Sequence, residues 1–188
     1  MNNINLTNLD AGHRQLALAV RLFFNDGDPV CVHTLVCAAR EIYEKSLKKA
    51  GRQRMFDLIK QAHPGHTETQ LWNVLNNHRN FFKHPKSGAQ DFSDEENDGM
   101  LLIASYDCFQ VCGDNIIAEA DAFLLWMKAT STLFRVNGEL PTETREDQIL
   151  HDLDVRYPGL RDASREEKKR FGRSLFSDGC PLIVPSAS

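Results

Sequence analysis

Apolar residues recur at the spacing of an α-helix along most of this chain, and that pattern constrains the fold more than any other feature of the sequence. In the first segment Leu9, Leu16, Val20 and Phe23 fall on one face of a helix. No segment shows the sustained two-residue alternation of a strand. Each helix then has one apolar stripe to bury, and short connections make consecutive helices neighbours. The sequence therefore predicts an all-α fold, an antiparallel up-and-down bundle of four to five main helices.

Capping signals indicate where these helices begin and end. Asp28 precedes Pro29, a residue favoured at the first helical position, and Gly51 can end the same helix in the left-handed conformation. Capping boxes, in which a hydroxyl residue is followed three positions later by Glu or Gln, start at Thr67 and Ser93. The predicted helices of the bundle span about residues 7–24, 29–50, 54–61, 67–84, 93–112 and 115–136.

The composition changes after Pro141, where charged residues become more frequent and apolar residues fewer. We expect a helical-bundle domain over residues 1–138 and a C-terminal extension over residues 139–188. The extension contains two short helical segments, about 143–154 and 164–176. It ends in an extended tail, Pro181–Pro185, whose apolar centre favours docking onto a protein surface over free disorder.

The charge and the cysteines bound the function and the compartment. A formal net charge of −4 and an isoelectric point near 6.0 give no general attraction for a polyanion, so any contact with nucleic acid must be local. The first residues lack the pattern of a secretory signal, and no run approaches the roughly 18 apolar residues of a membrane-spanning helix. Five cysteines at irregular spacing favour reduced thiols over a disulfide framework. These features predict a cytoplasmic protein without membrane association.

The stretch from Asn77 to Pro85 contains the side chains best suited to chemistry on a phosphate. The imidazole of His84 can take and give a proton near neutral pH, and the guanidinium of Arg79 can neutralise a phosphoryl oxygen. On a helix, Asn77, Asn80 and His84 share one polar stripe, whereas Arg79 lies about 140° around the axis from His84. Convergence within one chain is therefore not guaranteed. A dimer can instead bring the arginine of one copy beside the histidine of the other.

The same helix has an apolar arc that should face the core. His78 lies in the middle of this arc, which consists of Leu71, Val74, Leu75, Phe81 and Phe82. We interpret His78 as a packing residue satisfied by one hydrogen bond, not as a catalytic group.

Arg79 and Asn80, followed after three more residues by His84 in a helical domain of this size, resemble the HEPN superfamily, whose shared pattern is Arg, four to six residues, His. The resemblance covers roughly residues 9–136. It implies a metal-independent endoribonuclease, often the toxin of a toxin–antitoxin or defence system, that acts as a dimer with two motifs facing one cleft. It also implies that His84 is the general acid or base, that Arg79 stabilises charge on the phosphate, and that Asn80 positions the scissile group or His84.

The residues expected to bind phosphate or RNA are Arg79, Lys83, Lys86 and Asn77. The same cations would also interact favourably with the negative end of the helix dipole without any catalysis. The sequence therefore leaves open whether the protein is an enzyme. The alternatives are a module of this fold that binds a nucleotide or phosphate without cleaving it, and a helical dimerisation scaffold. The expected partners are a second copy of the chain, an RNA or nucleotide ligand and an antitoxin protein.

No metal site and no cofactor are predicted. Cys108 and Cys112 lie four residues apart on one helix face, a spacing that zinc can use, but their apolar neighbours favour buried thiols. His63 and His66 have no third ligand nearby in sequence. Gly-rich phosphate loops, nucleophile elbows and His-Glu-x-x-His motifs are absent from the sequence.

Overall fold

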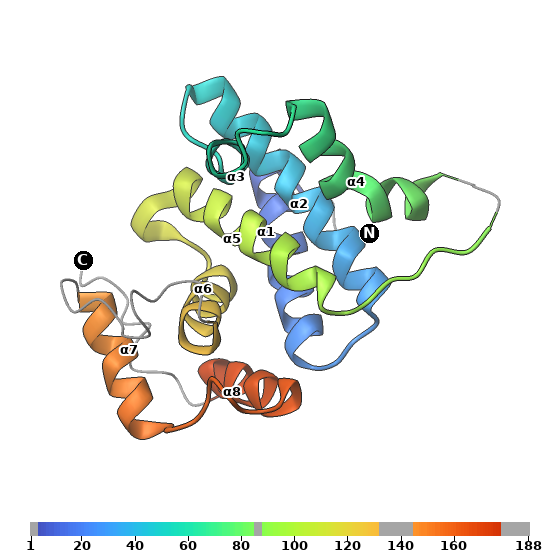
Figure 1. Cartoon of the computed structure of the whole chain (residues 1–188). Helices are drawn as coiled ribbons and strands as arrows, with labels where there is room; N and C mark the ends of the chain where they lie inside the picture. Colours follow the sequence, from blue (N-terminus) through green and yellow to red (C-terminus); the bar gives the residue numbers. More distant parts are fainter. Residues whose placement is uncertain (1–3, 85–87, 132–144, 178–188) are drawn as a thin grey trace. The chain divides into compact units, whose positions relative to one another are not determined.

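The computed structural model describes residues 4–84, 88–131 and 145–177, and every regular element in those ranges is helical (Figure 1). The prediction of an all-α protein is confirmed over this part of the chain. None of the helices in it combines the length and the apolar character needed to cross a bilayer. The elements are α1 (Asn8–Phe24), α2 (Pro29–Ala50), α3 (Met55–Ala62), α4 (Glu68–Lys83), α5 (Glu96–Cys112), the 3-10 turn η1 (Gly113–Asn115), α6 (Ala118–Thr130), α7 (Arg145–Arg156) and α8 (Arg165–Ser177).

The chain divides into two compact units, Met1–Ala120 and Asp121–Ser188. The domain boundary expected at residue 138 falls within residues 132–144, which lie outside the described residues. The expected extended tail, Pro181–Pro185, also lies outside them. Both expectations stay predictions.

Local hydrogen bonds explain why the helices of the first unit begin and end where they do. The carboxylate of Asp28 caps α2 by accepting a hydrogen bond from the backbone N–H of Val30 at 2.8 Å. Gly51 ends α2 with φ = 64°, a left-handed conformation that a residue without Cβ adopts at little cost. At the start of α4 the backbone N–H of Thr67 donates to Oε1 of Gln70 at 2.8 Å, which completes a capping box. These three signals were all predicted from the sequence.

The capping box predicted at Ser93 forms only in part, because the Ser93 N–H donates to Oε1 of Glu96 at 3.5 Å while the Ser93 hydroxyl bonds to a different backbone group. The Ser93 hydroxyl accepts a hydrogen bond from the backbone N–H of Glu95 at 3.3 Å, and the regular helix begins only at Glu96. A tight turn, closed by the bond from the Glu96 N–H to the Ser93 carbonyl at 3.1 Å, takes up the residues between. The turn satisfies the same backbone groups that a cap would satisfy, so the helix begins about three residues later than the sequence indicated.

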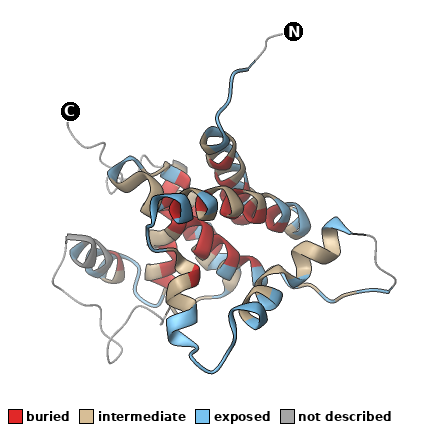
Figure 2. Ribbon diagram, turned by 90° about the horizontal axis from the view of Figure 1, so that it is seen from above, coloured by how far each residue is buried: buried red, intermediate tan, exposed pale blue. Residues whose placement is uncertain are grey.

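The core of the first unit lies where α2 packs against α1 and α5 (Figure 1). Burial of a large apolar side chain contributes roughly 1.5–3 kcal/mol, and many such side chains are buried on these three helices. The three helices therefore carry most of the stability of this unit. The buried residues gather along them in Figure 2. They are Leu16, Ala19, Val20, Phe23 and Phe24 on α1, Val32, Val36, Ala39, Tyr43 and Leu47 on α2, and Met100, Leu101, Ile103, Ala104 and Cys108 on α5.

Helix α4 packs along one side of α2 and contains no buried residue. The prediction that the apolar arc of this helix faces the core was therefore wrong. Val74 is 74% exposed, and Leu71 and Leu75 are only half-buried. The arc spans more of the helix circumference than the contacts of α4 with its neighbours cover, so part of it faces solvent.

The second unit contains the rest of α6 with α7 and α8. Phe123, Trp126, Leu153 and Phe171 are buried within it. The indole N–H of Trp126 donates to the backbone carbonyl of Lys168 at 2.7 Å, which joins α6 to α8. Two short helices after residue 141 were predicted, and α7 and α8 confirm them within two residues at each end.

Candidate functional site

Arg79, the arginine of the motif, lies against α2. Its guanidinium forms an ion pair with the carboxylate of Glu41, and only 20% of its side chain is exposed. His84 is the C-cap residue of α4, and its backbone N–H donates to the Asn80 carbonyl at 3.1 Å. The His84 side chain is exposed, and no hydrogen bond or ion pair among the described residues engages its imidazole. No hydrogen bond or ion pair among the described residues joins the two principal motif residues within one chain.

A surface groove of about 330 Å³ runs between α2 and α4, and Arg79 contributes to its wall. We call it the α2–α4 groove. Its lining has four cationic side chains and two carboxylates, and both carboxylates are already neutralised by arginines, Glu41 by Arg79 and Glu44 by Arg54 at 2.9 Å. The groove therefore has an excess of positive charge in a protein that is acidic overall. Its lining residues are Arg40, Glu41, Glu44, Lys45, Lys48, Trp72, Asn76 and Arg79.

Arg40 is the buried cation of this groove, with 2% of its surface exposed. Its Nη2 donates to Oδ1 of Asn76 at 2.5 Å, and its guanidinium lies over the ring of Trp72 at 5.4 Å. The Nε and Nη1 groups have no hydrogen-bond partner among the described residues. A buried donor without a partner costs about 1–3 kcal/mol, and more when it is charged. Arg40 is therefore a buried cation whose hydrogen-bonding capacity is only partly used by the described residues.

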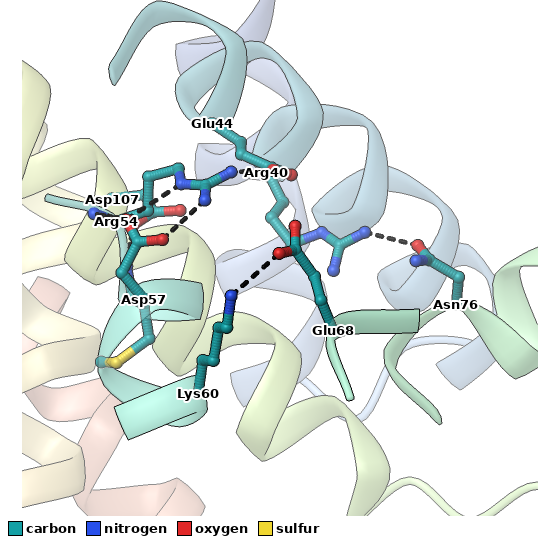
Figure 3. A network of polar contacts seen from close by, with 9 residues as sticks. Arg40, Glu44, Arg54, Asp57, Lys60, Glu68, Asn76 and Asp107 are labelled. Carbon is teal, nitrogen blue, oxygen red and sulfur yellow. Dashed lines mark hydrogen bonds and ion pairs between the residues drawn. The ribbon is translucent and has the colours of Figure 1, made fainter. Parts of the chain in front are cut away.

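An aromatic stack holds the wall of the groove in place. Trp72 stacks on Phe56 of α3 with ring centroids 3.9 Å apart and planes 11° from parallel. The guanidinium of Arg54 lies 5.5 Å from the centroid of the Phe56 ring. Figure 3 shows Arg54 bonded to Asp57, at 2.6 Å, and to Glu44. One guanidinium thus lies over each ring of the pair, Arg40 over Trp72 and Arg54 over Phe56.

A salt bridge and a backbone cap extend this network (Figure 3). Lys60 of α3 pairs with Glu68 at the start of α4 at 3.0 Å. The carboxylate of Asp107 accepts a hydrogen bond from the backbone N–H of Met55 at 2.7 Å and so fixes the start of α3 against α5. Burial raises the pKa of Asp107 to about 6. These contacts connect the groove to the core of the first unit.

The other predicted phosphate ligands lie around Arg79 with different exposure. Lys83 and Asn77 are exposed, and Lys83 shares a smaller hollow of about 40 Å³ with Thr34 and Arg79. Lys86 lies outside the described residues. Arg79 therefore lines both hollows. It shares the larger one with Arg40, Lys45 and Lys48, and the smaller one with Lys83.

His78 contacts the loop before α5 and the first residue of that helix. Its ring contacts Phe82 and Phe92, and its Nε2 pairs with the carboxylate of Glu96 at 2.5 Å. The side chain is 14% exposed. These contacts hold α4 and the loop before α5 together, and they give His78 a packing role separate from the groove.

His33 occupies the centre of the same aromatic cluster and is buried. Its Nδ1–H donates to Oδ1 of Asn97 at 3.1 Å, while Nε2 has no partner among the described residues. Burial is the largest cause of a pKa lowered below the ordinary value for histidine. Burial at the contact of α2 with α4 and α5 therefore favours the neutral form of His33.

Sequence reasoning did not identify Arg40 or Trp72 as part of the site. Arg40 follows directly after Ala39 in the predicted apolar stripe of α2, and a charged residue at the border of a buried stripe is a signal that could have been used. Trp72 shares one helix direction with Asn76 and Arg79, which the helical angles indicated. The angles on one helix could not predict the contacts of Trp72 with Arg40 on α2 and with Phe56 on α3.

The site thus combines a cationic groove with an exposed imidazole at the end of the same helix. A guanidinium and an ammonium group can bind phosphate, and a free imidazole can transfer a proton near neutral pH. No family model matches the chain, and no curated protein or solved structure matches it either.

Proposed function

We propose that this protein is a HEPN-type, metal-independent endoribonuclease that acts as a homodimer in the cytoplasm. The observation that carries the proposal is the exposed imidazole of His84, unpaired among the described residues, at the end of the helix whose Arg79 lines a cationic groove. The proposal includes the antiparallel up-and-down bundle of such domains. It also includes their usual biological role, a toxin or defence nuclease restrained by an antitoxin protein.

The chemistry assigned to these residues is RNA cleavage by the neighbouring 2′-hydroxyl. His84 takes the proton of that hydroxyl while its oxygen forms a bond to phosphorus, and the bond from phosphorus to the 5′-oxygen breaks. The leaving oxygen receives a proton from the second imidazole of the dimer. Arg79 stabilises the charge on the non-bridging oxygens, and Asn80 orients the scissile group. The products are a 2′,3′-cyclic phosphate and a 5′-hydroxyl.

The different surroundings of Arg79 and His84 in one chain support the dimeric form of the proposal. Arg79 is paired with Glu41 on α2, whereas His84 is exposed beyond the last turn of α4. The outer face of α4 includes Asn73, Val74 and Asn77, which are all exposed. A second copy seated along this face would bring its own motif to the end of α4.

The test is cleavage of a mixed RNA pool in the presence of EDTA. His84→Ala should lower the rate by about 10²–10⁴-fold, the contribution of a positioned acid or base, while the melting temperature changes little because the side chain is exposed. His66→Ala is the matched control, since His66 is an exposed histidine outside the motif. Absence of cleavage by the wild-type protein, or cleavage that survives His84→Ala, contradicts the nuclease.

A second function is favoured by the unpaired N–H groups of Arg40. In this alternative the α2–α4 groove binds the phosphate of a nucleotide and no bond is cleaved. Arg40 would donate from Nε and Nη1 to phosphate oxygens after a small rearrangement that exposes these atoms, and the ring of Trp72 offers an apolar wall to the rest of the ligand.

Adenine nucleotides and inorganic phosphate, added separately, distinguish this alternative. A ligand that binds the native state raises the melting temperature, and Arg40→Met or Arg79→Ala should remove that shift. Arg170→Ala is the control, because Arg170 is an exposed cation of the second unit. A shift that persists in Arg40→Met and Arg79→Ala places the ligand elsewhere and contradicts the groove as its site.

A further inference from the structure

Three potential metal ligands that are far apart in sequence meet between α1 and α5. His13 of α1 lies beside Cys108 and Cys112 of α5, and the ligand atoms of all three are within 4.8 Å of one another. The Nε2 atom of His13 is 3.3 Å from Sγ of Cys112. No other group of three or more His, Cys, Asp or Glu side chains in the described ranges has such an arrangement.

These separations fit a tetrahedral zinc ion. With Zn–S bonds of about 2.3 Å and Zn–N bonds of about 2.0–2.1 Å, neighbouring ligand atoms in a tetrahedron lie roughly 3.5–3.8 Å apart. The His13–Cys112 distance is already near this value, and the 4.8 Å limit leaves about 1 Å of adjustment for the remaining pairs. Rotation of the two thiols about their χ1 angles provides that adjustment without moving either helix.

The spacing along α5 supports the arrangement independently of the distances. Cys108 and Cys112 are one helical turn apart, so their sulfur atoms project from the same face toward α1. His13 is the only one of the three that comes from a different helix. A bound ion would therefore connect α1 directly to the end of α5.

We propose that His13, Cys108 and Cys112 form a zinc site with three protein ligands and a fourth position open to water. Two thiolates neutralise the charge of Zn²⁺, and the imidazole completes a Cys₂His set of the kind that zinc prefers. Cys112 is the last residue of α5, so the negative end of the helix dipole faces the ion. His13 and Cys112 are half-buried, which leaves the fourth position a route to solvent, whereas Cys108 is buried.

The surroundings of the three ligands are ordered and apolar. The buried ring of Tyr43 lies beside His13 with ring centroids 5.8 Å apart, and it orients the imidazole. Gly12, the residue before His13, lets α1 approach α2 closely, because a Cβ at that position would lie 3.2 Å from a side-chain carbon of Ile42. The ligands are thus presented by closely packed helices of the first unit, and contacts around metal ligands help to orient them.

Cobalt is the probe that reports the ligands directly. The reduced, metal-free full chain should bind Co²⁺ with a thiolate-to-cobalt charge-transfer band and the intense visible bands of a tetrahedral site, and Zn²⁺ should displace it. Cys112→Ser and His13→Asn should each weaken zinc binding by more than the roughly 10–100-fold typical of outer-shell substitutions. Both positions are half-buried, so these variants test the site even if the buried Cys108→Ser does not fold.

Cys31→Ser is the matched control, because Cys31 is an exposed thiol on α2 and should leave the spectrum and the affinity unchanged. A spectrum without the charge-transfer band overturns the proposal, and so does zinc affinity that is equal in wild type, Cys112→Ser and His13→Asn. An equal loss in Cys31→Ser would do the same. The site does not include Arg79 or His84, so its failure and the failure of the RNA cleavage assay are separate outcomes.

Discussion

Helices α5 and α4 both pack against α2, but they differ in almost every other respect. Helix α5 buries an apolar face that includes Leu101 and Ala104, whereas α4 has no buried residue and is held by an aromatic stack, an ion pair and a histidine cluster. Hydrophobic burial is strong and non-directional, whereas stacked and paired groups are weaker and position side chains specifically. In this protein α5 contributes mainly to the core and α4 mainly to the groove that could bind a phosphate, whereas α2 contributes to both.

Truncation of matched leucines should show the difference most strongly. Leu101→Ala removes a fully buried side chain of α5 and should lower the free energy of unfolding by about 2–5 kcal/mol. Leu75→Ala, at a half-buried position of α4, should cost about 1 kcal/mol. Urea denaturation of both variants measures the two values. Equal losses would mean that α4 contributes to the core as fully as α5.

Loss of the stack should open α4 without unfolding the core. Trp72→Ala removes the ring that packs between Arg40 and Phe56, at a cost of roughly 2 kcal/mol given its partial exposure. Amide hydrogen exchange on α4 should accelerate roughly 10- to 30-fold while exchange on α2 and α5 changes little. Val74→Ala, an exposed change on the same helix, is the control that should leave exchange on α4 unaltered. If amide exchange accelerates equally on α2, α4 and α5, then α4 does not open independently of the core.

A smaller effect should come from pH at the contact between the two regions. The pKa of His33 is lowered in the folded state from an ordinary value of 6.5, mainly by burial, with His78, Glu96 and Arg40 as the charged groups that face it. The unfolded chain therefore binds a proton more readily, so this residue reduces stability as the pH falls below about 6.5. When the pH falls from about 7.5 to 5.5, wild type should lose more stability than His33→Phe, a variant that keeps an aromatic ring but has no titratable group at this position.

The control for the pH effect is His66→Gln, at an exposed position outside the cluster. It should retain the pH slope of the wild-type protein in urea titrations. If His33→Phe also retains that slope, then burial does not hold His33 neutral and the cluster is open to solvent.

The helices themselves were largely predictable, because their end signals are local in sequence. Asp28 and Gly51 bound α2 through bonds to residues at most four positions away, and such bonds can be anticipated from residue types. The start of α5 was placed three residues early because a turn at Ser93 satisfies the same groups as a cap. Val74 was misplaced because periodicity indicates a face but not how much of it a neighbouring helix covers.

The candidate site was predictable only in part, for the same reason. The residue types of Arg79 and His84 and the angle between them followed from the sequence. The pairing of Arg79 with Glu41 depends on a contact across 38 positions, and the approach of His13 to Cys112 on one across 99, which no local pattern encodes. Tertiary contacts of this kind are set by how the whole set of helices packs.

The stack between Arg40, Trp72 and Phe56 has a practical consequence for optical measurements. The chain contains two tryptophans, and Trp126 lies in the second unit. With Trp126→Phe, the intrinsic fluorescence of the protein comes from the indole that forms the wall of the α2–α4 groove. A guanidinium over one face and a phenyl ring on the other make that emission sensitive to any charge placed nearby. The fluorescence of Trp72 can therefore report occupancy of the groove without an attached label.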